Sequence, residues 1–249
     1  MPMSARSAKI RLRCDLDGAF SHGPDAAYDG PMTEQDATAT DRSWLADWRR
    51  RVGELYAEVR HTSATDPAAA WERWRAERES LYRSHPQSPV GPADRASFRA
   101  RHWPYDERLR ATVPLRPAPA PPGGLALAPL ALPNSGAESP AFDRIGVVRL
   151  PLPDGTSEVP VFWMRGYAGG LFLPLGDATN GSETYGAGRY VLDTAKGADL
   201  GGDPAAGTLV IDLNFAFQPS CAFDPRWACP LAPAESRVGA RIEAGERLG

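Results

Sequence analysis

The hydrophobic periodicity of this chain changes near Gly124, and that change constrains the fold more than any other feature. Between residues 43 and 86, apolar residues recur every three or four positions, as in amphipathic helices. After Gly124, short apolar runs with a period close to two alternate with turn clusters such as "PNSG" and "PDGT". Hairpin-length connections between such runs favour antiparallel pairing. We therefore predict an α+β fold, with two N-terminal helices packed on a mostly antiparallel β sandwich or barrel-like body.

The two expected helices have clear signatures. The first presents one apolar face, made by Trp44, Trp48, Val52, Leu55, Tyr56 and Val59. The second begins with Asp66 as N-cap and Pro67 at the first helical position, and Pro86 ends its pattern. So many aromatic residues could form a ligand box, but a helical layer packed on a sheet is the expected arrangement.

Composition divides the chain into four parts. Residues 1–40 are polar and turn-rich, which predicts a disordered tail, and whether translation starts at Met1 or Met32 stays open. Residues 41–249 are expected to form a single domain. It consists of a helical part (41–86), a proline-rich irregular wrapping segment (87–124) and a β-rich body (125–249). The prolines of the wrapping segment exclude a long helix or a central strand there.

Charge and hydropathy exclude several classes of function. The net charge of −3 and the pI near 5.9 provide no basic face for nucleic acid. No window of 18 uninterrupted apolar residues exists, so no membrane span is expected. The N-terminus lacks the apolar region of a secretory signal, and Asp15 and Asp17 disfavour a transit peptide. We expect a cytoplasmic protein that keeps its thiols reduced, and the oligomeric state stays open.

The strand pattern "TLVIDLNFAF" carries the first candidate binding residues. Strict alternation puts Asp212 and Asn214 on the face opposite Leu209, Ile211 and Phe215. If Arg189, from the strand "GRYVLD", faces Asp212 across a sheet, the pair could hold a carboxylate-bearing ligand. The alternative is an ion pair that fixes strand register.

The stretch "LPLGDATNGSETYGAGRY" is a glycine-rich turn between two strands. Its amides could cradle an anion, and Asp177, Thr179 and Tyr185 would lie beside it. The spacing fits neither a P-loop nor a dinucleotide fingerprint, and catalytic motifs such as G-x-S-x-G and H-E-x-x-H are missing from the sequence. Catalytic residues are thus unknown, and no cofactor is expected. The candidate binding residues are Asp177, Thr179, Tyr185, Arg189, Asp212, Asn214 and Glu235.

The segment "CAFDPRWACPLAP" contains two of the three cysteines. Cys221 and Cys229 could be a redox pair, a disulfide, half of a zinc site with His85 and His102, or two buried packing thiols. The spacing is unlike any zinc finger or ribbon, so no metal site is expected. Because prolines stiffen both ends of the segment, we predict a compact loop that brings the two cysteines close together and buries them.

Several stretches resemble the domain of unknown function 1684 family of prokaryotic proteins. They are "HPQSP" (85–89), "WPYD" (103–106), "LFLPLGDATNGSETYGAGRY" (171–190), "LVIDLNFAFQPSCAFDPRWACPLAP" (209–233) and "AGER" (244–247). The resemblance implies a bacterial or archaeal cytosolic protein, but no particular reaction.

The chain also departs from the pattern of that family. The family tends to have Phe at Leu213, Tyr at Phe217 and Phe223, and Asn at Gln218 and Ser236, the residue after Glu235. Two phenolic hydroxyls and one amide are thus missing from this chain, so a ligand that they held would bind differently here or not at all.

Three classes of function remain open. The leading hypothesis is a soluble small-molecule-binding β-rich protein with its polar candidates near one cavity, and whether it is an enzyme stays open. The alternatives are a non-catalytic scaffold or partner-binding module, and a thiol-redox protein that uses Cys221 and Cys229. A pocket lined by at least three of the polar candidates would favour the first, and dispersed candidates the second.

Overall fold

The computed structural model describes residues 38–118, 129–136, 140–167 and 169–248 of the 249-residue chain. Residues 1–37 of the expected tail, including Met32, lie outside the described residues. Helix α1 spans Ala39–Thr62 and begins at a capping box. The Thr38 hydroxyl accepts a hydrogen bond from the Asp41 amide at 3.1 Å, and the Asp41 carboxylate accepts one from the Thr38 amide at 3.0 Å.

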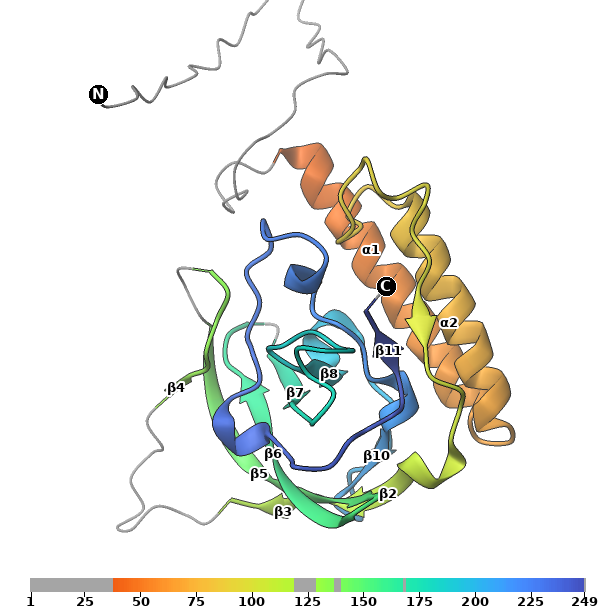
Figure 1. The fold of residues 1–249 in the computed structure, drawn as a ribbon. Helices are drawn as coiled ribbons and strands as arrows, with labels where there is room; N and C mark the ends of the chain where they lie inside the picture. The colour runs from red at the N-terminus through yellow and green to blue at the C-terminus, as the bar shows by residue number, and fades with distance from the viewer. Residues whose placement is uncertain (1–37, 119–128, 137–139, 168, 249) are drawn as a thin grey trace, which may run out of the picture. The chain divides into compact units, whose positions relative to one another are not determined.

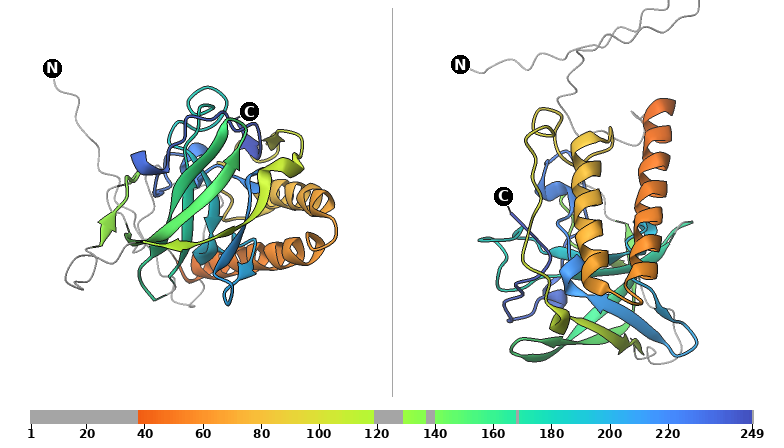
Figure 2. Two further views of the ribbon diagram at one scale, coloured as in Figure 1. Left: turned by 90° about the horizontal axis from the view of Figure 1, so that it is seen from below. Right: turned by 90° about the vertical axis from the view of Figure 1, so that its right-hand side faces the viewer.

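Helix α2 spans Pro67–Ser84, with the predicted N-cap Asp66 and the predicted first-turn proline. The two helices lie side by side and pack against one side of the β-rich part (Figure 1). Only the C-terminal half of the predicted apolar face of α1 is buried, because its first turns extend beyond the sheets (Figure 2). Trp44 is accordingly 41% exposed and meets only the edge of the His85 ring, at 5.7 Å between centroids.

The largest sheet is antiparallel, in the order β3-β5-β6-β7-β8, with β4 paired to β5. Its strands are β3 (Arg116–Pro117), β4 (Leu130–Ala131), β5 (Ala141–Leu152), β6 (Gly155–Met164), β7 (Gly170–Leu175) and β8 (Arg189–Asp193). A register shift between Arg144 and Gly146 bends the long β5–β6 hairpin. Every residue of β8 is buried, so this strand lies in the core rather than at the surface.

A second antiparallel sheet has the order β2-β10-β9, from Arg110–Pro114, Thr208–Asp212 and Gly202–Asp203. The third pairs β1 (Arg101–His102) with β11 (Glu246–Arg247) near the C-terminus. The described 3-10 helices are η1 (Glu107–Leu109), η3 (Thr194–Lys196), η4 (Leu213–Phe215), η5 (Ser220–Ala222) and η6 (Ala234–Ser236). The proline-rich segment 87–124 thus contributes β1, β2 and β3, each at an edge of its sheet, where a proline removes no ladder hydrogen bond.

The α+β fold class is confirmed. In the described residues the three sheets are antiparallel and do not close into a barrel, so the barrel-like form of the prediction is not found. One apolar core joins the helices to both larger sheets. At its centre Trp74 of α2 meets Phe215 edge-to-face, with ring centroids 5.2 Å apart and both side chains fully buried. No helix in the described parts has the length and hydrophobicity to cross a membrane.

The predicted alternation along "TLVIDLNFAF" is wrong beyond Asp212. The strand ends there, and residues 213–215 form η4 with the Asp212 carboxylate as N-cap, accepting from the Asn214 amide at 3.0 Å. Because a short helix replaces the expected strand, residues 213–216 are all buried, and no solvent-facing side exists at this point.

Candidate functional site

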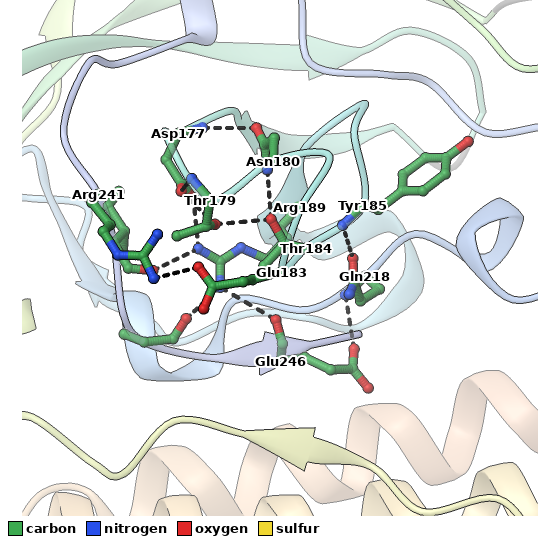
Figure 3. A network of polar contacts seen from close by, with 12 residues as sticks. Asp177, Thr179, Asn180, Glu183, Thr184, Tyr185, Arg189, Gln218, Arg241 and Glu246 are labelled. Atoms are coloured by element: carbon green, nitrogen blue, oxygen red, sulfur yellow. Dashed lines mark hydrogen bonds and ion pairs between the residues drawn. The ribbon is translucent and has the colours of Figure 1, made fainter. Parts of the chain in front are cut away.

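Arg189 lies at the centre of a fully buried polar cluster, and its bonds fix the C-terminal segment (Figure 3). Its guanidinium pairs with Asp177 Oδ2 at 2.6 Å. It also donates to the main-chain oxygens of Ile242 at 3.1 Å, Ala244, and Glu246 at 3.3 Å. Burial lowers the pKa of Arg189, and the Asp177 carboxylate opposes that shift. The Arg189 guanidinium thus donates its hydrogen bonds to other groups of the protein, and these bonds hold residues 242–246 in place.

The glycine-rich loop bonds mainly to itself. Asp177 Oδ1 accepts from the Thr179 amide at 2.7 Å and from its hydroxyl at 2.5 Å, and the Thr179 and Thr184 hydroxyls are 2.9 Å apart. The Tyr185 amide donates to Gln218 Oε1 at 3.0 Å, while the Tyr185 ring points away from Arg189 (Figure 3). The amides of Thr179, Gly181 and Thr184 likewise donate within the loop, so they are not free to cradle an anion.

Asp212 and Asn214 belong to a second buried cluster. The Asn214 side chain accepts from the Asp106 amide at 2.9 Å and donates to the Asp106 carbonyl at 2.8 Å. Asp212 accepts from Arg110 and from the Tyr105 hydroxyl, each at 3.3 Å. Burial raises the pKa of Asp212, and hydrogen bonds from Asn214 and Arg110 oppose that shift. This cluster holds the "WPYD" segment against η4.

The expected pairing of Arg189 with Asp212 is not found, because β8 and β10 belong to different sheets. Arg110 stands opposite Asp212 in the β2–β10 ladder and supplies its ion pair. Glu235 lies apart from both clusters on η6, exposed, in an ion pair with Arg144 at 2.9 Å. The candidate residues therefore gather into two structural clusters and one surface pair. None of them lines the cavities described below or those near Trp44 and Phe142.

The "WPYD" and "AGER" segments connect the two clusters, through residues that sequence reasoning did not select. The Trp103 amide donates to the Gly245 carbonyl at 3.2 Å, and the Arg189 guanidinium lies over the Trp103 ring, 5.3 Å from its centroid. Buried Glu246 pairs with Arg78 of α2 at 3.0 Å. No local sequence pattern predicts an ion pair between a glutamate and an arginine on separate segments. The only available signal was that Glu246 lies within the "AGER" motif.

Two larger cavities open at the surface. One, of about 770 Å³, is lined by the "WPYD" residues together with Arg108 and Arg241. The other, of about 480 Å³, lies between residues 90–101 and the C-terminal segment, and we name it the Gln218 cavity. Gln218 is 1% exposed, and its Nε2 has no hydrogen-bond partner in the described structure. The same holds for Nε of Arg247, which also lines this cavity.

The predicted proximity of the two cysteines is confirmed. Cys221 on η5 and Cys229 are both buried free thiols, and the Cys221 amide donates to Cys229 Sγ at 3.4 Å. The Ser135 hydroxyl accepts from the Cys229 amide at 2.9 Å and donates to the Trp227 carbonyl at 3.1 Å, which closes the loop. The described residues include no group of three or more potential metal ligands, and His85 instead bonds Asp47 at 3.1 Å.

Comparison with known proteins supports the fold. The chain is similar to the solution NMR structure of an uncharacterized protein from Haloarcula marismortui, with 23% sequence identity and a TM-score of 0.50. The alignment covers 70% of this chain and 90% of that one. No curated protein matches the sequence. The model of the family described as "Protein of unknown function (DUF1684)" matches residues 98–247, which include both polar clusters and the two cysteines, and the chain belongs to this family.

Proposed function

We propose that the protein binds a small organic anion in the Gln218 cavity. The observation that carries the proposal is the buried Gln218 Nε2, a donor without a partner among the described residues. A buried donor left unpaired lowers the free energy of unfolding by roughly 1–3 kcal/mol, and a ligand oxygen in the cavity would remove this cost by accepting the hydrogen bond. The side-chain oxygen of Gln218 already accepts from the Tyr185 amide, so the orientation of the amide is fixed and the nitrogen is the free group.

The charges around the cavity favour a carboxylate. Arg99, Arg101 and Arg247 line it, against the carboxylates of Asp94 and Glu246. The charge of Glu246 is already matched by Arg78. Guanidinium groups present paired donors that fit a carboxylate, and such charge-assisted bonds are stronger than neutral ones.

The walls of the cavity are partly apolar. Val90 is buried there, and Phe98 meets Phe223 edge-to-face with ring centroids 5.8 Å apart. A pocket with an apolar wall and a few polar groups is the usual form of a small-molecule site. We therefore expect a ligand that combines a carboxylate with an aliphatic or aromatic body.

The larger cavity is a weaker candidate because both arginines that line it form short ion pairs, whereas Arg247 of the Gln218 cavity lies 3.9 Å from Glu183. Arg108 forms an ion pair with Asp106 at 2.7 Å, and Arg241 forms one with Glu243 at 2.7 Å. A ligand would have to displace these partners to reach the guanidinium groups.

A thermal-shift screen against carboxylate metabolites tests the proposal, since a ligand that binds the folded state raises the melting temperature by mass action. For a compound that does so, Arg101→Gln should weaken binding on the order of tenfold, the effect of losing one charge-assisted bond. Gln218→Glu should abolish binding, because it keeps the acceptor for Tyr185 and replaces the donor with a negative charge. Arg108→Gln, at the larger cavity, is the matched control and should leave binding unchanged.

A non-catalytic scaffold is the second candidate, and the two satisfied clusters around Arg189 and Asn214 favour it. A screen without any stabilising compound, or binding that ignores both Arg101→Gln and Gln218→Glu, would contradict the anion site and favour the scaffold. A prokaryotic, cytoplasmic protein without nucleic-acid partners is part of the proposal in either case. Its support is the family resemblance, the free thiols and the negative net charge.

A further inference from the structure

Cys221 and Cys229 form a cluster that the proposed anion site does not use. Eight positions separate them in sequence, yet the main chain at one cysteine donates to the sulfur of the other. The loop between them is fixed at several points, since Trp227 Nε1 donates to the Pro89 carbonyl at 3.2 Å. Ser135 bonds the main chain at both Trp227 and Cys229. Two thiols are thus held together by a fixed loop that has no other assigned role.

The two thiols differ in their surroundings. The Cys229 thiol and the side chains of Ser135 and Tyr185 lie near Cys221, and each lowers the pKa of its thiol. Donors directed at a sulfur favour its thiolate form. The hydrogen bond with Cys229, which outweighs burial, lowers the pKa of Cys221 to about 6. The same bond and burial raise the pKa of Cys229.

Exposure adds to this asymmetry. Cys221 is 9% exposed and Cys229 is 2% exposed, and Ser135 and Tyr185 beside Cys221 reach the surface. A small molecule can thus approach Cys221 more readily than Cys229. Reactive cysteines are typically those with a stabilised thiolate and access to solvent. A buried thiol with a raised pKa reacts only with a group that is held directly beside it.

We propose that Cys221 and Cys229 are a redox-active pair that exchanges with low-molecular-weight disulfides. The Cys221 thiolate attacks one sulfur of the disulfide RS–SR and forms a mixed disulfide, and RS⁻ leaves and takes up a proton. Cys229 loses its proton to solvent and attacks Cys221 Sγ, forming the intrachain disulfide and releasing a second RS⁻. The net change oxidises two cysteine thiols and reduces one disulfide to two thiols. This inference is independent of the anion site.

The pH dependence of alkylation is the most direct test. In full-length protein carrying Cys14→Ser, the rate of Cys221 modification by iodoacetamide is followed by peptide mass spectrometry between pH 5 and 9. We expect a midpoint near pH 6, against about 8.5 for an ordinary thiol. The absolute rate is less informative, because a thiolate of low pKa is also a weaker nucleophile and the gain at neutral pH is only a few-fold. Tyr185→Phe should move the midpoint upward, and Tyr167→Phe, on an exposed side chain, is its control.

Oxidised glutathione tests the exchange itself. Wild type should form the Cys221–Cys229 disulfide, Cys229→Ser should accumulate one glutathione on Cys221, and Cys221→Ser should accumulate none on Cys229. An ordinary midpoint for Cys221, modification only after unfolding, or a mixed disulfide that Cys229 never resolves would each overturn the proposal. The pH profile needs no substitution at Cys221, Cys229 or Tyr185, so a variant at those positions that fails to fold leaves the test intact.

Discussion

His102 should make this protein lose stability in mild acid, and replacing it should remove that loss. The imidazole lies on β1 between Trp71 and Trp74, with ring centroids 6.2 and 5.6 Å away and nearly perpendicular planes. Neither ring nitrogen has a hydrogen-bond partner in the described part of the chain. Burial lowers the pKa of His102 to about 4, and the Glu246 carboxylate only partly opposes it.

The sign of the effect follows from linkage. Above pH 6.5 the imidazole is neutral in the folded and unfolded states, so it causes no pH dependence. Between pH 6.5 and about 4 the unfolded state binds the proton more tightly, and the free energy of unfolding falls as the pH falls. At pH 5 the loss is about 2 kcal/mol, and the full loss below pH 4 is about 3 kcal/mol.

His102→Phe keeps a ring between the two indoles and removes both unpartnered nitrogens. Urea unfolding at pH 7.5 should show a variant at least as stable as wild type, since no unpaired polar atom remains. At pH 5 its advantage should grow by about 2 kcal/mol. His61→Gln, on an exposed side chain, is the control and should retain the wild-type difference between the two pH values. An equal effect of His102→Phe at both pH values would refute a buried neutral imidazole.

Three further predictions concern the interlocked C-terminal segment. Arg189→Met should lower the free energy of unfolding by about 3–5 kcal/mol, because it leaves the buried Asp177 carboxylate unpaired, and denaturant titration measures this. Gly245→Ala should destabilise strongly by the same assay, since the glycine has φ 75° and a Cβ would lie 2.4 Å from the Ala216 carbonyl oxygen. Ser236→Ala should raise the melting temperature, because the buried Ser236 hydroxyl has no partner among the described residues, and removing an unpaired buried hydroxyl recovers about 1 kcal/mol. An unchanged or lowered melting temperature would contradict it.

Local rules predicted the features that depend on neighbouring residues. The start of α2 follows from Asp66 and Pro67, whose effects act within one helical turn. The change of period near Gly124 likewise separated the two helices from the long strands that follow it, because side-chain period is set by backbone geometry, although β1, β2 and β3 already lie before Gly124. The burial of the two cysteines also followed from local stiffness.

Predictions that depended on long-range pairing were less successful. Alternation indicates how residues lie on one strand, but not which strand lies beside it. A pair of Arg189 with Asp212 could therefore be considered only as a possibility, and the partner of Arg189 is Asp177. Asp212 is also the last residue of its own strand. Its carboxylate accepts a hydrogen bond from the Asn214 amide, and this bond competes with continued β structure. Arg189 and Asp212 therefore belong to two different polar clusters.

Two of the departures from the family pattern leave a buried polar atom unpaired in the described structure. Gln218 and Ser236 both stand where the family tends to have Asn, and each has a buried side-chain atom without a partner there. Ser236 is fully buried and lines none of the described cavities, so its missing partner is a matter of packing. Gln218 lines an open cavity beside Arg247, where a ligand can reach it. The two departures therefore differ in consequence: a change at Ser236 should alter stability alone, whereas a change at Gln218 should alter what the protein binds.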